Sequence, residues 1–305
     1  MQIMQDNSQT RRDMIGIGWM LLTGACFVMV NSIVRGLEGA LPAAQAAFIR
    51  FVIGLVFLAP VLVPALRRGF SRPVWGLIAT RGALHCVAVT LWFYAMSRIT
   101  VAEVTAIGFL NPIIVTVGAA LFMGEKLAAR RIAAVGVALL GALVVLRPGM
   151  RPLDPGHLSQ IGAAIAFGAS YLVAKRLSER IPASVVVAMM SLTVAIGLLP
   201  LAIAQWVPPT FGQIMWLGLV AVFATAGHYS MTRAFAAAPL TVTQPVTFLQ
   251  LVWASLVGVI VFHEPLDGWV MLGGGMMIGA ITYITWREAR LRAAPRTPPA
   301  PATKA

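Results

Sequence analysis

The sequence predicts an all-α integral membrane protein, with ten transmembrane helices arranged as two inverted five-helix repeats. Three observations support this fold class. Hydrophobic residues make up 59% of the chain and charged residues only 11%, far from the balance of a soluble domain. The apolar residues come in runs of about 20, the length at which a helix crosses the hydrocarbon of a bilayer. Finally, the second half of the chain repeats the pattern of the first.

Ten apolar runs follow one another along the chain, separated by short polar links that are too small to form a soluble domain. A short N-terminal segment, 1–13, precedes them. A Pro- and Ala-rich tail, 287–305, follows them and is expected to be disordered. The predicted spans are 14–34, 46–64, 74–96, 101–123, 132–146, 158–174, 183–204, 211–232, 240–262 and 268–286.

The first run is expected to be a retained span. Arg11 and Arg12 precede it, as in a signal peptide, but the run is too long for a signal-peptide core and no convincing Ala-x-Ala cleavage site follows. Cys26 and Cys86 both fall within predicted spans, where packing is the expected role and a disulfide framework is not.

The positive charge is distributed unevenly across the predicted membrane. The chain carries 23 Lys and Arg against 10 Asp and Glu, and most of the basic residues lie in the N-terminus, the even-numbered links and the tail. The other side holds only Arg35, Arg98, Arg147 and Arg151. Because Lys and Arg stay cytoplasmic, both termini should be on the cytoplasmic side. The net charge of +13 therefore reflects orientation in the bilayer, and a nucleic-acid partner is not expected.

Two segments share one apolar pattern that ends in Glu-x-Leu. FLNPIIVTVGAALFMGEKL begins at Phe109, and FLQLVWASLVGVIVFHEPL begins at Phe248, so Glu125 and Glu264 hold equivalent places. At an offset of 140, the residues Phe27, Arg35, Leu37, Pro42 and Pro60 match Phe167, Lys175, Leu177, Pro182 and Pro200. Because each unit has five spans, an odd number, the second copy enters the bilayer from the opposite side.

Inverted repeats favour a protein that exchanges two conformations of nearly equal energy. One conformation would open inward and the other outward, so that a site near the midplane faces each side in turn. The simpler alternative is that duplication only enlarged the bundle.

These segments also resemble a known family. FIRF in the second span, the stretch from RGALHC to GEKL and the stretch from RAFAAAPL to FHEP are similar to the two EamA-type repeats of the drug/metabolite transporter superfamily. The resemblance implies repeats at 14–147 and 158–286 and a bacterial-type inner-membrane carrier of amino-acid, nucleotide-like or vitamin-like solutes. It also implies a cavity lined by spans one, three, four, six, eight and nine.

Charged residues inside the spans are costly and need an explanation. Arg81 lies near one end of the third span and is expected to snorkel to the headgroups. Arg50 could snorkel, pair with an intramembrane acid or contact an anionic solute. Glu103 is expected at a solvated helix start, or as a partner of Arg98 or a proton carrier. Glu125 and Glu264 are expected to stabilise tight turns.

Polar and aromatic side chains in the spans indicate a shared cavity. Thr243, Thr247 and Gln250 share one helical face, and Gly108 and Asn111 match the last two in the other repeat. Buried amides must face protein, water or solute, although bonds between helices would also satisfy them. Trp92, Tyr94, Tyr171 and Tyr229 could line the same cavity or form interfacial belts. His228 could exchange a proton or be a hydrogen-bonded core histidine. The predicted solute-binding residues are Asn31, Arg50, Trp92, Asn111, Tyr171, His228 and Gln250.

Several function classes lack support in the sequence. GxxxxGK[ST], HExxH and GxSxG are absent, so no catalytic residue, metal ligand or cofactor is predicted. Transport would be passive or driven by a proton or solute gradient. The alternatives are a lipid-linked sugar flippase and an enzyme acting on lipid-linked substrates. A Gly275-xxx-Gly279 pattern suits close helix contact, within the chain or in a homodimer.

Overall fold

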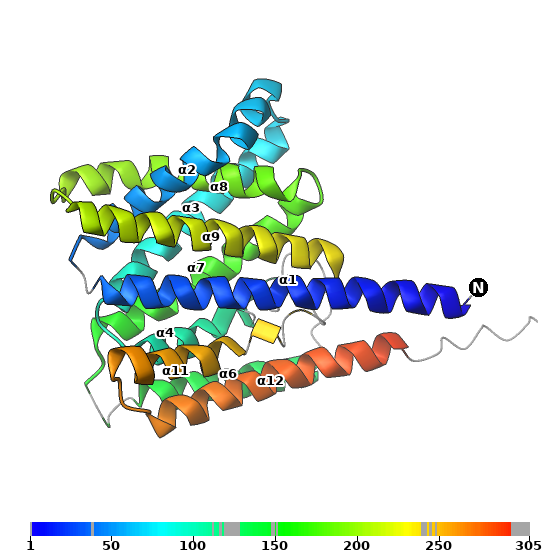
Figure 1. The fold of residues 1–305 in the computed structure, drawn as a ribbon. Helices are drawn as coiled ribbons and strands as arrows, with labels where there is room; N and C mark the ends of the chain where they lie inside the picture. Colours follow the sequence, from blue (N-terminus) through cyan, green and yellow to red (C-terminus); the bar gives the residue numbers. More distant parts are fainter. Residues whose placement is uncertain are drawn as a thin grey trace, which may run out of the picture.

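The computed structural model is a bundle of helices, most of which run across the view of Figure 1 in one direction or its opposite. It describes residues 2–37, 40–111, 113–115, 118, 129–147, 150, 152–238, 243, 246–247 and 249–293. The helices are α1 Gln2–Gly36, α2 Ala43–Arg68, α3 Arg72–Met96, α4 Val101–Gly108, α6 Ala129–Leu146, α7 Pro155–Ser178, α8 Ala183–Ala204, α9 Phe211–Ala237, α11 Leu249–Phe262 and α12 Gly268–Ala293.

Helices occupy each of the ten predicted runs, and no strand occurs among the described residues, which confirms the all-α prediction. Within the described ranges, six helices are long and apolar enough to cross a membrane. They are 12–36, 43–68, 72–96, 155–178, 183–204 and 211–237. Shorter apolar helices cover 101–115, 252–262 and 268–280.

The fourth and ninth predicted spans are interrupted at equivalent places in the two repeats. α4 ends at Gly108, a turn follows at Phe109, and helical residues resume at 110–111 and 113–115. α11 begins only at Leu249, after a short 3₁₀ turn at 246–247. Two prolines of these spans, Pro112 and Pro245, lie outside the described residues, as does Glu125. Where a helix is interrupted, backbone N–H and C=O groups lose their partners within the helix. In a membrane protein such groups occur only where they are buried in protein or line a water-filled cavity.

The last helix extends further than the sequence predicts. α12 continues to Ala293, beyond the expected end of the tenth span at 286 and into the segment expected to be disordered. Residues 294–305 lie outside the described part of the chain.

Side chains fix the starts of several helices at the bundle ends. In α4 the Thr100 hydroxyl accepts from the Glu103 amide at 3.2 Å, and the Glu103 carboxylate accepts from the Thr100 amide at 3.0 Å. Thr210 and Gln213 form the same reciprocal pair before α9. Each pair satisfies amides that have no partner within the helix, which sets where the helix begins.

The two halves of the chain interlock through matched helix pairs. α1 packs on α9 and α3 packs on α7, which are equivalent pairs under the repeat, while α2 packs on α8 and α6 on α12. Gly227 of α9 lies against Phe27 of α1, and an added Cβ would be 2.9 Å from that ring. Gly141 of α6 and Gly273 of α12 bring two backbones together: a Cβ on Gly141 would be 2.6 Å from the Gly273 carbonyl.

The close glycine contact of α12 lies two positions from where the sequence suggests. Gly275 and Gly279 are exposed, and a Cβ on either would meet no atom within 4 Å. Packing of this pair within the chain, the simpler expectation, is wrong. Gly273 makes the contact instead because its face of α12, and not the Gly275 face, turns toward α6.

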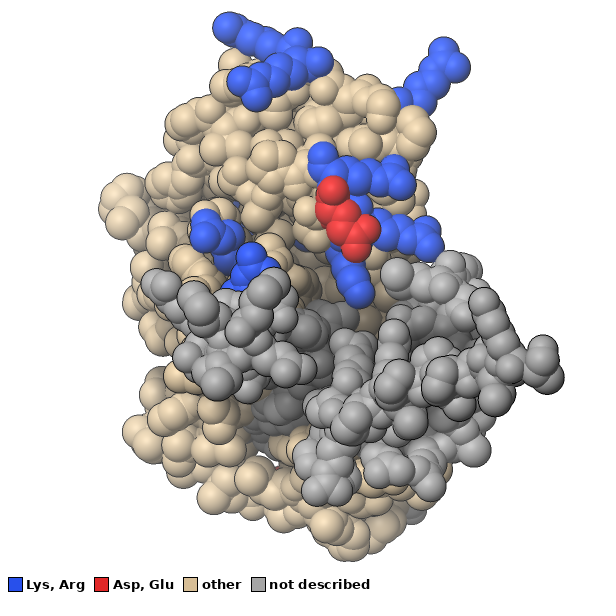
Figure 2. Space-filling model, turned by 90° about the vertical axis from the view of Figure 1, so that its right-hand side faces the viewer, with Lys and Arg blue, Asp and Glu red and all other residues tan. Residues whose placement is uncertain are grey.

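The two ends of the bundle differ in charge. α1 begins and α12 ends at the same end, called here the terminal end (Figure 1). Viewed from that side, the surface carries many Lys and Arg side chains and little acid among the described residues (Figure 2). Arg67 and Arg68 end α2 and Lys175 and Arg176 lie in the last turn of α7. The opposite end is called the far end.

Candidate functional site

A cavity of about 200 Å³, the central cavity, lies between the two halves of the chain. Its described walls come from α1, α2, α3, α4, α7, α9 and α11, together with the residues flanking α4 and α11. These include all six spans that the family resemblance implies. It extends from Gln160, in the second turn of α7, to Lys175 in the last turn, a length of about 22 Å along the helix. The cavity thus reaches toward the terminal end.

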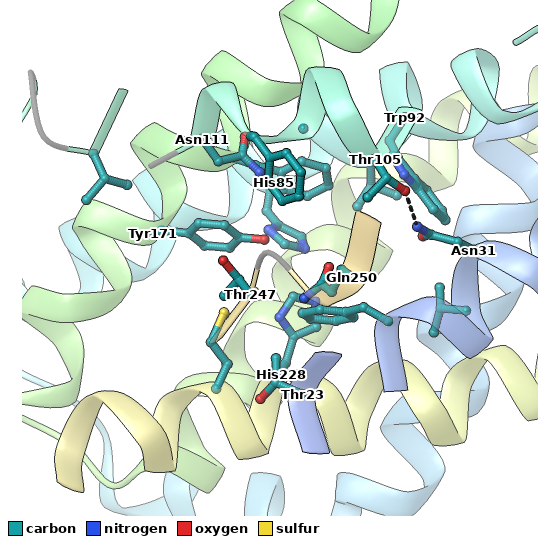
Figure 3. A pocket seen from close by; sticks show the side chains of 18 of the residues that line it. Thr23, Asn31, His85, Trp92, Thr105, Asn111, Tyr171, His228, Thr247 and Gln250 are labelled. Atoms are coloured by element: carbon teal, nitrogen blue, oxygen red, sulfur yellow. Dashed lines mark hydrogen bonds between the residues drawn. The ribbon is translucent and has the colours of Figure 1, made fainter. Parts of the chain in front are cut away.

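All seven residues singled out from the sequence line this cavity. They are Asn31, Arg50, Trp92, Asn111, Tyr171, His228 and Gln250. All of them except Arg50 are labelled in Figure 3, where they surround a common space. Gly108 and Thr247, which are equivalent in the two repeats, line it as well. The residues selected from the sequence therefore surround one cavity.

Two histidines lie at the centre of the cavity, and the sequence indicated only one. The rings of His85 and His228 meet edge to face, 5.2 Å apart between centroids. His85 is fully buried, and its Nδ1 lies 3.4 Å from the Ser170 hydroxyl. In Figure 3, Tyr171 points toward His85 from α7.

Several buried polar atoms around the cavity have no hydrogen-bond partner within the described structure. They are the Arg50 Nε, His85 Nε2, His228 Nδ1, Asn111 Oδ1 and Gln160 Oε1 atoms. A buried polar atom without a partner costs about 1 to 3 kcal/mol, so five of them around one cavity are expensive. Hydrogen bonds to water or to a bound solute would recover that cost.

Other polar groups of the cavity bond to the protein. The Asn31 amide donates to the Thr105 hydroxyl at 3.5 Å, shown in Figure 3. The Gln160 amide donates to the Val104 carbonyl at 3.0 Å. Such bonds hold the side chains in place and leave their other polar atoms directed at the cavity.

Arg50 gives the cavity a buried positive charge. The residue is 6% exposed, and its guanidinium lies over the Phe51 ring at 3.9 Å from the centroid. Lys175 adds a second cation, and the described lining includes no Asp or Glu. Among the three alternatives from the sequence, contact with a solute fits this placement, because Arg50 neither snorkels nor pairs with a described acid.

Aromatic side chains supply the apolar walls. Phe167 and Tyr171, one turn apart on α7, are stacked with centroids 6.0 Å apart and planes 17° from parallel. Trp92 and Phe27 lie on other walls. Flat walls of this kind suit a planar solute, which stacks on aromatic faces.

Two further aromatic candidates lie elsewhere. Tyr94 is at the far end, where Arg98 lies over its ring at 5.0 Å from the centroid. Tyr229 accepts a hydrogen bond from Arg233 at 2.9 Å and packs edge to face on Trp19. Neither lines the cavity, because their faces of α3 and α9 point to other neighbours.

The expectation that Arg81 snorkels is wrong. Arg81 is 1% exposed and donates from Nη1 to the Val186 carbonyl of α8 at 3.3 Å. Its face of α3 packs against α8, so the side chain has no path along the surface to the headgroups. It lies one turn from His85 and adds positive charge near the cavity without lining it.

The expectation that Glu103 is solvated is also wrong. Glu103 is 5% exposed, caps its own helix through Thr100 and lies 3.3 Å from the His157 Nε2 atom of α7. The contact joins the two repeats at the far end. A partner from the other half of the chain cannot be read from one helix alone.

Other polar contacts join the repeats at the same end. Arg35 of α1 forms an ion pair with Glu264 at 3.1 Å, and Arg147 after α6 pairs with Asp267 before α12. Gln45 of α2 donates to the Val207 carbonyl at 2.6 Å and accepts from the Val207 amide at 2.9 Å. Glu264 therefore also forms an ion pair with the other repeat, beyond the expected role of stabilising a turn.

The sequence could have indicated His85 and Gln160. His85 follows Arg81 by four residues on one face of a span, and an ionisable residue within a membrane is a functional candidate by default. Gln160 is an amide in the second turn of an apolar helix. Neither is among the repeated positions described above, which is why that pattern missed them.

A helical membrane bundle with a polar cavity between two interlocked halves has the architecture of a membrane transporter. The comparisons with known proteins agree. The model of the EamA-like transporter family matches residues 14–147 and 154–286. A riboflavin transporter of Vibrio cholerae is 27% identical over 282 residues, which cover 90% of this chain and 94% of the relative.

Two further matches extend over most of the chain. An S-adenosylmethionine uptake transporter of Rickettsia bellii is 25% identical over 278 residues, covering 90% of this chain and 95% of the relative. A solved crystal structure, 20% identical, has a TM-score of 0.62 and covers 92% of this chain and 99% of its own, which supports the fold. The chain belongs to the EamA-like transporter family. It is a multi-pass membrane transporter of the drug/metabolite superfamily and not an enzyme.

Proposed function

We propose that this protein is a secondary transporter that moves a small organic solute by alternating access around the central cavity. The observation that carries the proposal is the placement of seven polar and aromatic residues from both repeats around one cavity with unsatisfied polar atoms. A site of this kind, at the interface of two repeats, is where such carriers bind their solutes.

The matched helix pairs support an inverted arrangement of the halves, 14–147 and 158–286. Contacts of α1 with α9 and of α3 with α7 exchange under the repeat, whereas α2 with α8 and α6 with α12 map onto themselves. This is the pattern of a two-fold relation, and with five spans in each half its axis would lie in the membrane plane. Ten spans follow if the interrupted fourth and ninth helices also cross the bilayer.

The charge distribution supports an orientation in the inner membrane with both termini in the cytoplasm. The terminal end carries the basic residues (Figure 2) and would be cytoplasmic, and the far end would be external. The central cavity reaches toward the cytoplasmic end, while polar contacts join the halves at the external end. These features are those of an inward-facing or occluded state.

The chemistry of the cavity favours a planar solute that is neutral or anionic. Stacked rings offer flat apolar walls, while Arg50 and Lys175 give positive potential without a described acid to offset it. Riboflavin, the solute named for the Vibrio cholerae relative, is planar and neutral and is the first to test. S-adenosylmethionine, named for the Rickettsia bellii relative, carries a sulfonium cation that Arg50 would repel.

A transporter without a nucleotide-binding motif needs another driving force. The chain has no GxxxxGK[ST] sequence, so we propose that solute moves down its own gradient or is coupled to a proton or second solute. One elementary charge moved per cycle would contribute about 2.3 kcal/mol at 100 mV.

Flux in proteoliposomes tests the proposal. Purified protein should accumulate radiolabelled riboflavin above protein-free vesicles, saturate with concentration and show counterflow when unlabelled riboflavin is loaded inside. S-adenosylmethionine should not compete at equal concentration. Absence of counterflow for riboflavin and for a panel of planar neutral and anionic metabolites would overturn the transport proposal; competition by S-adenosylmethionine would overturn the charge preference.

A further inference from the structure

The Arg35–Glu264 ion pair lies close to two cavities of the protein. Arg35 lies one helical turn beyond Asn31, which lines the central cavity. Glu264 lines a second cavity of about 200 Å³ at the external end, called the outer cavity, together with Glu103 and Gly258. On α4, Glu103 lines the outer cavity and the next residue, Val104, lines the central one. α4 therefore forms part of the wall between the two cavities.

The ion pair joins the two repeats. The Arg35 Nε atom donates to the Glu264 carboxylate at 3.1 Å, and Arg35 Nη1 donates to the carbonyl of Met96 at the end of α3 at 3.2 Å. The two side chains are 24% and 10% exposed. One arginine thus links α1 and α3 of the first repeat to the segment that follows α11 in the second.

The sequence around Glu264 is arranged so that its carboxylate can reach Arg35. The Glu264 amide donates to the Gly258 carbonyl at 2.9 Å, which folds the chain back over the last turns of α11. A Cβ on Gly258 would lie 2.8 Å from the Glu264 Oε2 atom. Only glycine leaves room there for the carboxylate in its present position.

We infer that the Arg35–Glu264 pair is the external gate of this carrier. It holds α1 to the end of α11 while the central cavity faces the cytoplasm, and it has to break for the two cavities to join and the solute to exchange outside. The inference rests on the proposed transport function. Arg35 and Glu264 act as positioning residues, since neither lines the central cavity.

A second ion pair at the same end provides a matched control. Arg147 and Asp267 also link the two repeats, and Asp267, like Glu264, lines the outer cavity. They flank α6 and α12, however, and neither helix contributes a described residue to the central cavity. The backbones of α6 and α12 pack closely at Gly141 and Gly273. This pair should therefore be structural and should not control access to the central cavity.

Access can be measured without knowing the solute. Val104→Cys, introduced after Cys26→Ala and Cys86→Ala, places a thiol on the wall of the central cavity. A membrane-impermeant maleimide is added to the outside of right-side-out vesicles. Arg35→Gln with Glu264→Gln should speed labelling about tenfold, the change that a shift of about 1.4 kcal/mol in the equilibrium produces. Arg147→Gln with Asp267→Gln should leave the rate within twofold.

A glycine substitution tests the same gate without removing charge. Gly258→Ala should displace the Glu264 carboxylate and speed labelling in the same direction. Gly275→Ala is the matched control, because a Cβ there meets nothing within 4 Å. Unchanged labelling in both the double glutamine variant and Gly258→Ala, with Val104→Cys reactive in denatured protein, would overturn the gate. Equal acceleration by the Arg147–Asp267 control would overturn its specificity.

A cross-link extends the test to transport. In the cysteine-free background, Arg35→Cys with Glu264→Cys should lose counterflow of riboflavin when oxidised and regain it when reduced. Arg147→Cys with Asp267→Cys should transport in both states. Full counterflow of the oxidised, cross-linked first pair would overturn the gate. If the parent protein moves no riboflavin, the proposed solute fails, whereas labelling still decides the gate.

Discussion

Replacing Arg50 by Met should stabilise the protein and impair transport. A charged side chain at the centre of a membrane helix costs about 2.5 to 3.5 kcal/mol on insertion scales, which is an upper bound for Arg50, about two turns into α2. Arg50 recovers part of this through the Phe51 ring, a contact worth about 0.5 to 2 kcal/mol, and its Nε atom has no partner in the described structure. Met fills similar space without charge, so unfolding should become harder by about 1 to 2 kcal/mol.

The same substitution removes a charged hydrogen-bond donor from the cavity. A bond from a charged group to a solute contributes about 1.5 to 3 kcal/mol, so kcat/KM for transport should fall by about tenfold to a hundredfold. Thermal unfolding in detergent and initial rates of riboflavin uptake measure the two effects on one preparation. Stability and activity should change in opposite directions, which is typical of a residue kept for function.

Arg81→Met is the control for this prediction. Arg81 is also buried, but it bonds to Val186 and does not line the central cavity, so KM should stay within about twofold of the parent. A lower unfolding temperature for Arg50→Met together with unchanged uptake would show that Arg50 is a structural residue, and would refute the reasoning.

Three further predictions concern the cavity and the packing. Asn111→Ala with Gln250→Ala should abolish flux while membrane abundance, measured by quantitative blotting, stays normal; normal flux would remove these residues from the site. His85→Phe should keep the ring contacts with Phe51 and Phe167 and still lower uptake, because it removes the unpaired Nε2 atom beside the cavity; unchanged uptake would contradict a polar role. Gly141→Leu should lower the unfolding temperature by overpacking α6 against α12, at a cost of about 1 to 3 kcal/mol, and an unchanged temperature would contradict that contact.

The sequence predicted the helices and the cavity because both follow from periodicity and repetition. Apolar runs located the spans, and comparing the two halves pointed to Asn111 and Gln250, which meet at one cavity although 139 positions separate their chain segments. Such features can be predicted because they depend on residues within one helix or on the similarity of the two repeats.

Other features depend on which helix faces join across the halves. Arg81 could reach the headgroups from an isolated helix, but α8 covers it, and Glu103 finds His157 only when α4 meets α7. Gly273 and Gly275 are equally suited to close contact by sequence, and only the rotation of α12 selects Gly273. Tertiary packing decides these cases, and the sequence of a single helix does not show which of its faces packs against another helix.

Access to the central cavity from both faces of the membrane tests the account most directly. Val89 of α3 is buried on the cavity wall, and Val89→Cys in the cysteine-free background provides one reporter. An impermeant maleimide should label it from the cytoplasmic side quickly and from the external side more slowly, and a transported solute should protect it from both. Labelling from one side alone, with and without solute, would contradict a carrier that alternates between two openings.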